Sequence, residues 1–316
     1  MKAITVASYG GPEVLQYSEV EMPAAGPGTS LIKVEAAGVN YADLMMSRGE
    51  YPGGPEPGFI PGLEIAGTVV DGSRKGEKVM AFSWGGGYAE YAAAPDAMIF
   101  PLPAEFTPQQ GAGFLTTYLT AYFALWMADL KPDERLLIQA AAGGVGTAAI
   151  QLAREMGAEI FAVTGSPDKE ARLKQMGAEH VLVERGYNIA GPLREMTNGE
   201  GVDIILESNS GPGLERDLEL LRPLGRMIVY GSLSGAPGSV DPGLLIGGNI
   251  SIHGLYLGGM LADADRARMA MDELREYIRR RKLQPVVDRE FPLNEAAAAH
   301  LYMRDRKNFG KLVLIP

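Results

Sequence analysis

A glycine-rich segment, residues 141–146, has the composition of a turn that binds phosphate. An apolar run at 135–140, typical of a strand, leads into it, and a stretch of helical periodicity from Gly144 to Met156 follows. A helix that begins at such a turn directs unpaired backbone N–H groups and the positive end of its dipole at an anion. This order predicts a dinucleotide site, contacted by Ala142, Gly143, Gly144, Val145 and Gly146.

The two flanking glycines have separate expected tasks. Gly143 would let the backbone approach the phosphates, and Gly146 would let the helix pack closely on the strand. Ala141 stands where the usual first glycine would be, so the fingerprint is incomplete. The alternative is a glycine-rich turn that binds no ligand.

The end of the next predicted strand, residues 159–164, indicates which nucleotide is bound. An NAD site normally has Asp or Glu there for the ribose 2′-hydroxyl. This chain has the neutral residues Thr164, Gly165 and Ser166, followed by Lys169 and Arg172. Hydroxyl groups and cations suit a 2′-phosphate, which a carboxylate would repel, so NADPH is favoured over NADH. Alternatively the two cations form a solvated helix face, and nearby carboxylates, Asp168 and Glu170, offset part of their charge.

The pattern around this turn predicts an α/β protein. Residues 2 to about 100 contain short strands separated by Gly and Pro, which indicates a compact all-β module. From 135 to about 252 apolar strands alternate with helices, which is typical of a doubly wound parallel sheet. Between them, Thr107 and Pro108 begin a helical stretch that runs to about Met127. The tail predicts a helix around 264–278, a helix at 295–303 capped by Asn294, and a strand at 311–315.

Composition excludes several classes of protein. A length of 316 residues predicts two domains, and the net charge of −10 disfavours nucleic acid. The chain has no apolar run of about 18 residues and no signal-peptide pattern, so we expect a cytoplasmic protein without a membrane partner. It has no cysteine, and its histidines, His180, His253 and His300, are far apart, so we expect no metal.

Motifs along nearly the whole chain resemble the medium-chain dehydrogenase/reductase superfamily, and within it the zinc-free, zeta-crystallin-like NADPH:quinone oxidoreductase branch. They comprise residues 1–4 with 10–15, 38–43, 48–52, 61–69, the turn at 140–146 and the ending 310–316. The resemblance implies a GroES-like catalytic domain from 1–120 and 260–316. It also implies a Rossmann NADP-binding domain at 121–259, with the nicotinamide in the cleft between the two domains.

The resemblance also assigns residues to tasks. Asn40 and Tyr51 match positions near the nicotinamide and substrate, and Lys169 and Arg306 match positions at the 2′-phosphate. Further matches along the cofactor are Thr120, Tyr230, Gly231, Ser232 and Leu255. The chain departs from the family where tyrosines are replaced by Met45 and by Glu184, the latter followed by Arg185, and in a shorter loop at 71–77.

These observations favour an NADPH-dependent quinone reductase that transfers hydride without a metal, with Asn40 and Tyr51 orienting the acceptor oxygen. One alternative is a reductase of activated C=C bonds in enals, enones or enoyl thioesters, with Tyr51 as proton donor. Another is a non-enzymatic nucleotide- or RNA-binding protein. The apolar segment 249–256 predicts an edge strand that pairs in a homodimer, as in the resembling family.

Overall fold

The structure of the protein is a computed structural model that describes residues 1–184 and 189–316. The chain forms two compact units. The first unit comprises Met1–Thr117 and Ile278–Pro316, and the second comprises Tyr118–Tyr277. Each unit has its own sheets.

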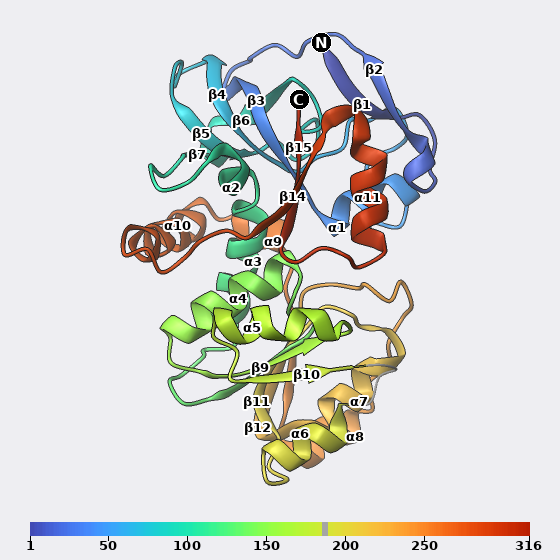
Figure 1. The fold of residues 1–316 in the computed structure, drawn as a ribbon, viewed down its shortest axis with the longest axis vertical. Helices are drawn as coiled ribbons and strands as arrows, with labels where there is room; N and C mark the ends of the chain where they lie inside the picture. Colours follow the sequence, from blue (N-terminus) through green and yellow to red (C-terminus); the bar gives the residue numbers. More distant parts are fainter. Residues whose placement is uncertain (185–188) are drawn as a thin grey trace. The chain divides into compact units, whose positions relative to one another are not determined.

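The first unit contains a sheet of seven strands with the order β14-β15-β3-β4-β5-β7, and β6 also pairs with β3. The last strand, β15, lies antiparallel to β3, so two strands that are far apart in the sequence are neighbours in this sheet (Figure 1). β1 and β2 form a separate two-stranded sheet. The strands are β1 Lys2–Val6, β2 Leu15–Glu19, β3 Thr29–Val39, β4 Glu64–Asp71, β5 Lys78–Phe82, β6 Tyr91–Pro95, β7 Ile99–Pro101, β14 Val287–Pro292 and β15 Lys311–Ile315.

The prediction of an all-β module over residues 2–100 was wrong in one respect, because helix α1, Tyr41–Arg48, lies within it. Asn40 is the N-cap, and its backbone N–H donates to Asp43 Oδ2 at 2.8 Å. Gly49 ends the helix with a φ of 71°. Eight residues are too few for a clear helical period, but the spacing of Asn40, Asp43 and Gly49 is a capping signal that could have revealed the helix.

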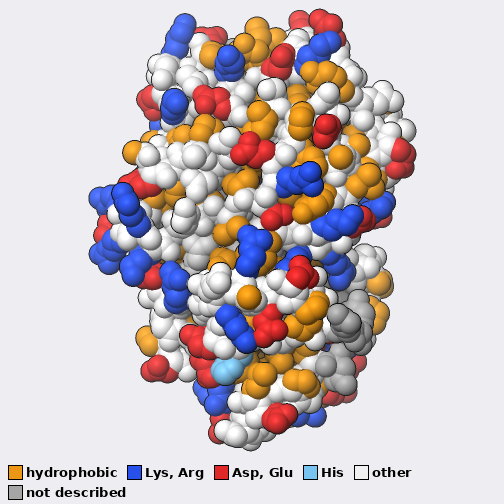
Figure 2. Space-filling model, in the orientation of Figure 1, with side chains coloured by type: hydrophobic (Ala, Val, Ile, Leu, Met, Phe, Trp, Pro, Cys, Tyr) orange, Lys and Arg blue, Asp and Glu red, His pale blue; other side chains and the backbone are white. Residues whose placement is uncertain are grey.

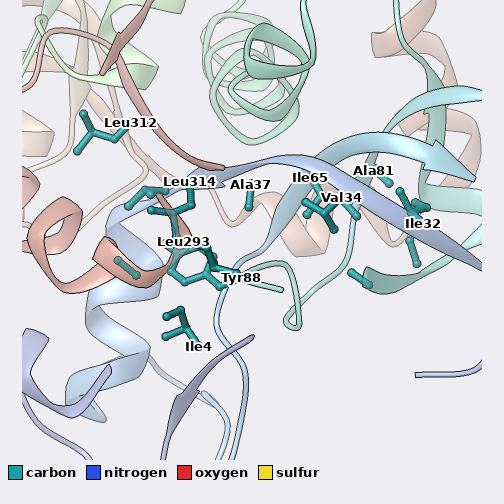
Figure 3. Packing of buried hydrophobic residues seen from close by; sticks show 14 of the residues in the cluster. Ile4, Ile32, Val34, Ala37, Ile65, Ala81, Tyr88, Leu293, Leu312 and Leu314 are labelled. Carbon is teal, nitrogen blue, oxygen red and sulfur yellow. The ribbon is translucent and has the colours of Figure 1, made fainter. Parts of the chain in front are cut away.

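The core of the first unit collects apolar side chains from nearly all of its strands and from α11, Ala296–Arg304. Figure 3 shows Leu293 and Tyr88 close together beside Ile4, with Leu314 next to them. Tyr88 is fully buried, so its hydroxyl must form hydrogen bonds with other groups inside the core.

The second unit contains six parallel strands in the order β10-β9-β8-β11-β12-β13, which confirms the predicted doubly wound sheet. Helices α4 and α5 cover one face, and α6, α7 and α8 cover the other (Figure 1). The strand order reverses between β8 and β11, which is where such sheets bind ligands. The strands are β8 Arg135–Ile138, β9 Glu159–Thr164, β10 His180–Val183, β11 Val202–Glu207, β12 Leu221–Val229 and β13 Ser251–Gly254.

Helix boundaries agree with the predictions in part. The five covering helices are α4 Gly144–Glu155, α5 Glu170–Met176, α6 Ala190–Met196, α7 Leu214–Leu218 and α8 Pro242–Gly248, of which α6 and α8 were not predicted. The others are α2 Pro108–Ala112, α3 Leu115–Met127, α9 Leu257–Leu261, also not predicted, and α10 Ala264–Arg279. Asn294 was wrongly predicted as a cap: a 3-10 turn, Leu293–Glu295, precedes α11 and makes Glu295 the N-cap.

The surface carries a concentration of basic side chains on one helix. Figure 2 shows Lys and Arg side chains gathered over α10, whose last residue, Arg279, begins the basic run at 279–282. Within residues 1–184 and 189–316, the helices are all too short or too polar to cross a membrane.

Candidate cofactor and acceptor sites

The glycine turn in the second unit has the geometry that its sequence predicts. β8 ends at Ile138, and Ala140 takes the left-handed φ of 48° that reverses the chain. Gly143 is the N-cap of α4, and its N–H donates to Ala140 O at 2.9 Å. A Cβ on Gly146 would lie 2.5 Å from both Cα and O of Ala141. Only glycine therefore lets α4 begin this close to the strand.

A buried polar cluster lies where the strand order reverses, at the carboxyl ends of β8 and β11. Gln139 donates through Nε2 to Asp217 Oδ2 at 2.9 Å, and Glu207 Oε1 accepts the N–H groups of Asn209 and Ser210, the latter at 2.8 Å. Burial raises the pKa of Glu207 to about 7, and the charge of Asp217 adds to the effect. None of these residues was predicted from the sequence as part of a site, although Glu207 lies in the region 135–252 where a parallel sheet was predicted.

The end of β9 carries the residues predicted to choose the nucleotide. Thr164 is buried and Lys169 is nearly so. Ser166 Oγ donates to Asp168 Oδ1 at 2.7 Å, and this hydrogen bond holds the pKa of the Asp168 carboxyl below its usual value. Arg185, which follows Glu184, lies outside the described residues. The N–H of Glu184 donates to Thr164 O at 2.8 Å.

The remaining predicted cofactor residues of the second unit follow strand ends or lie in a helix. Tyr230 follows β12, and its N–H donates to Glu207 O at 3.0 Å. Ser210 Oγ donates to Gly231 O at 2.7 Å, which joins the loops after β11 and β12. Leu255 is buried directly after β13, Thr120 is buried in α3, and Ser232 is half-buried.

Asn40 is held in the first unit by residues from three strands. It directly follows β3, while Glu64 begins β4 and Lys311 begins β15. The register places Gly38 opposite both Glu64 and Val313, so the ends of the three strands meet beside Asn40. A Cβ on Gly38 would lie 2.1 Å from Ala112 O, so glycine is required where α2 packs on this point.

The side chains at this junction form a closed set of hydrogen bonds. Lys311 Nζ donates to Asn40 Oδ1 at 2.7 Å, to Glu64 Oε1 at 2.8 Å and to Val39 O at 2.9 Å. Asn40 Nδ2 donates to Glu64 Oε1 at 3.0 Å, and Thr116 N donates to Glu64 Oε2 at 2.9 Å. The Lys311 and Glu64 side chains are 4% and 0% exposed, so this ion pair is fully inside the protein. Asn40 was predicted from the sequence as a site residue, whereas its two charged partners, Glu64 and Lys311, were not.

A second buried chain of polar groups starts from the backbone of Asn40. Asp43 Oδ2 accepts the Asn40 N–H at 2.8 Å and the Tyr88 hydroxyl at 3.0 Å. The Tyr88 oxygen in turn lies 3.2 Å from His300 Nε2. Burial raises the pKa of Asp43 to about 6 and lowers the pKa of His300 to about 3, with the charge of Arg48 adding to the latter shift. His300 is therefore a neutral structural residue at physiological pH.

Two predicted residues occupy less confined positions in the first unit. Tyr51 is half-buried in the loop after α1, and its carbonyl accepts the Gly54 N–H at 2.9 Å. Arg306 is exposed after α11 with a φ of 56°. Met45, the departure from the family pattern, is half-buried in α1. Across the described chain there is no group of three or more His, Cys, Asp or Glu side chains arranged to hold a metal ion.

Comparison with known proteins places the two units in one family. A sequence profile described as "Alcohol dehydrogenase GroES-like domain" matches residues 26–104, and one described as "Zinc-binding dehydrogenase" matches residues 144–276. A quinone oxidoreductase from Sus scrofa is 35% identical over 332 residues, covering 100% of this chain and 98% of its own. The chain belongs to the quinone oxidoreductase branch of the medium-chain dehydrogenase/reductase superfamily.

Solved structures of this family share the whole fold. A quinone oxidoreductase from Thermus thermophilus, described alone and in its complex with NADPH, is 35% identical with a TM-score of 0.90 and covers 100% of both chains. The Escherichia coli quinone oxidoreductase complexed with NADPH is 29% identical with a TM-score of 0.94, again covering 100% of both. The predicted family and fold are thereby confirmed.

Proposed function

We propose that the protein is an NADPH-dependent quinone reductase. The observation that carries the proposal is the glycine turn at the switch point of a six-stranded parallel sheet, in a chain 33–35% identical to quinone oxidoreductases over its full length. Structural relatives at 0.90 and 0.94 TM-score are described as NADPH complexes, which supports the same cofactor here.

The residues of the second unit would hold the cofactor. The N–H groups at the start of α4 would bind the pyrophosphate, because they point away from the helix and carry its positive dipole end. Thr164, Ser166 and Lys169 would bind the 2′-phosphate, and Arg306 is the further cation that we propose for this phosphate. Thr120, Gly165, Leu255 and the segment 230–232 would border the adenosine and nicotinamide portions.

The residues of the first unit would act on the acceptor. Bound NADPH supplies a hydride, so the quinone gains two electrons and one hydrogen nucleus and then takes a proton from water to complete the reduced product. Asn40 would hydrogen-bond the acceptor oxygen, and Tyr51 would help to orient the same oxygen. A quinone is already strongly electrophilic, so the main task of these side chains is to position the reactants, which contributes up to about 7–11 kcal/mol in favourable cases.

Steady-state assays of NADPH oxidation with a panel of para- and ortho-quinones test the proposal. We expect turnover with several quinones, and a Lys169→Ala change that raises KM for NADPH at least tenfold while leaving KM for NADH nearly unchanged. A chain that binds NADPH but reduces none of the quinones would show that the acceptor class is wrong. Equal effects on the two nucleotides would show that Lys169 does not recognise the 2′-phosphate.

We also propose that the protein forms a homodimer through β13. This strand lies at the edge of the six-stranded sheet, with His253 and Gly254 exposed, and an unpaired edge is a template for a second strand. Replacing Ile252 with proline, which cannot donate to a ladder, should shift the mass measured by light scattering from dimer to monomer. A monomer at micromolar concentration before the change would end this proposal.

A further inference from the structure

We propose that Lys311 and Glu64 are positioning residues that fix the polarity of the Asn40 amide, so that Asn40 meets the substrate only as a hydrogen-bond donor. This inference rests on the proposed function, in which Asn40 contacts the acceptor oxygen. It assigns a task in the reaction to a charged pair that lies behind Asn40 and was absent from the sequence-based site.

The orientation of an asparagine amide is set by what surrounds it, because its oxygen and nitrogen have nearly the same shape. Here Lys311 determines which way the Asn40 amide is turned. An ammonium group has donors and no acceptor, so the atom 2.7 Å from Lys311 Nζ must be the oxygen, Oδ1. The atom 3.0 Å from Glu64 Oε1 must then be the nitrogen, since a carboxylate can only accept.

The same contacts leave one group of the cluster uncommitted. The three ammonium donors of Lys311 have three acceptors, and both carboxylate oxygens of Glu64 have donors. Asn40 Nδ2 carries two hydrogens, of which Glu64 takes one, and the second has no acceptor among the residues that the structure describes. Asn40 is 7% exposed, so this remaining N–H is held in a nearly closed position rather than freely rotating.

A fixed donor suits the charge change of the reaction. As hydride enters the quinone, one carbonyl oxygen becomes an oxyanion, and an N–H already aimed at that oxygen stabilises the charge without reorganising. A reversed amide would present the lone pair of Oδ1 and repel the oxyanion. The Lys311–Glu64 pair therefore makes the difference between a favourable and an unfavourable contact although neither residue needs to touch the substrate.

The decisive experiment reverses the amide without removing it. Lys311→Met combined with Glu64→Gln removes both charges together, which avoids leaving one buried charge alone. The Thr116 N–H would hold the oxygen of the new glutamine, whose amide nitrogen would then face Asn40 and require Oδ1 there. We expect kcat with quinones to fall by about 100-fold, the loss typical of one missing oxyanion donor, while the dissociation constant for NADPH changes by less than about threefold.

A double-mutant cycle separates positioning from general damage. In an Asn40→Ala background the same pair of changes should lower kcat by less than about twofold, because the group through which it acts is gone. Lys311→Arg, which keeps a donor-only side chain, should retain more activity than the Lys311→Met/Glu64→Gln variant. The inference would be overturned if the Lys311→Met/Glu64→Gln pair, called the charge-free variant, lowered kcat by the same factor with and without Asn40. An unchanged kcat in the charge-free variant would also overturn it.

The outcome is distinguishable from failure of the proposed function. If the wild-type protein reduces no quinone, the function fails first, and the amide can still be tested by NMR of the Asn40 side-chain NH2 group. In the wild type one of its two hydrogens should exchange slowly because Glu64 accepts it, and that protection should disappear in the charge-free variant. Equal exchange of both hydrogens in the wild type would contradict the fixed amide.

Discussion

The glycine turn and the Asn40 cluster are both polar sites buried at strand ends, but they are built in opposite ways. The turn uses backbone groups from a short stretch of chain, residues 141–146, and its side chains are small so that a ligand can approach. The cluster uses side chains from Asn40, Glu64 and Lys311, the last of which is 271 residues away from the first along the chain. A site made of backbone depends on space, whereas a site made of charges depends on all partners being present.

The largest expected effect concerns space at the turn. Gly146→Val would place Cβ and two methyl groups against the Ala141 backbone, where Cβ alone already comes within 2.5 Å. We expect the affinity for NADPH to fall at least 100-fold, measured by fluorescence titration, because α4 must move away from β8. Gly191→Ala in α6 is the control, since no atom of the described residues lies within 4 Å of its added Cβ, and it should leave binding unchanged. Normal binding by the valine variant would show that the close approach is not needed.

The next effect concerns charge at the cluster. Lys311→Met alone leaves Glu64 buried without its counter-charge, which typically costs about 3–5 kcal/mol of stability. Urea denaturation should show this loss, and adding Glu64→Gln should restore most of it. Lys307→Met removes an exposed cation paired with Asp305 and should cost less than about 1 kcal/mol. A single variant as stable as the wild type would mean that Glu64 is not a buried charge.

A third test uses pH on the groups behind the cluster. The pKa of His300 is lowered to about 3, so folding favours its neutral form, and its contribution to stability is lost as pH falls from about 6.5 towards 3. The pKa of Asp43 is raised to about 6, so folding favours its protonated form, and stability is lost as pH rises from about 4 to 6. The two contributions oppose each other between pH 4 and 6.

Removing one of the two groups should therefore reveal the pH dependence of stability that the other group causes. When pH falls from 7 to 5, His300 should lower the free energy of unfolding by about 2 kcal/mol, and His300→Gln should remove this decrease. Over the same pH range Asp43 should raise the free energy of unfolding by about 1 kcal/mol, and Asp43→Asn should remove this increase. Urea denaturation at both pH values measures this, with the exposed His253→Gln as control. Identical pH slopes in all four proteins would show that neither group titrates differently on folding.

The smallest expected effect concerns Tyr51, which belongs to neither kind of site. As an orienting side chain in a loop it should matter little, so Tyr51→Phe should lower kcat/KM for quinones by about threefold or less. Assays with enones provide the contrast, because saturating a C=C bond requires a proton at carbon. A loss above 100-fold on enones with quinone turnover intact would favour the C=C reductase over our proposed function.

The same contrast explains what the sequence could predict. The turn, the strands around it and the neutral end of β9 are local patterns, and the parallel sheet was predicted correctly from them. Glu64 and Lys311 each begin an apolar strand, and a charged residue at a strand end is normally expected to be exposed. Only the register of β4 and β15 against β3 brings them to Asn40. The register between strands that are distant in the sequence cannot be predicted from the local hydrophobic pattern of either strand.

Errors at the level of elements have similar causes. Helix α1 was missed because eight residues show little periodicity, and its capping residues Asn40 and Asp43 could be recognised only together with Gly49. The helix cap was placed at Asn294 rather than Glu295 because a 3-10 turn has the same starting signal as an α-helix. Gln139, Glu207 and Asp217 were missed since their meeting depends on the order of strands in the sheet.

The position of β15 after the whole second unit in the chain has a consequence for synthesis. Residues 118–277 are all made before the strands that complete the first sheet, so during translation the second unit can begin to fold while β3 still lacks its C-terminal neighbour. Lys311 is made 247 residues after Glu64, and until it leaves the ribosome Glu64 lacks the cation that it pairs with in the folded protein. A premature stop codon before Lys311 would leave the glycine turn intact and the cluster of Asn40, Glu64 and Lys311 incomplete.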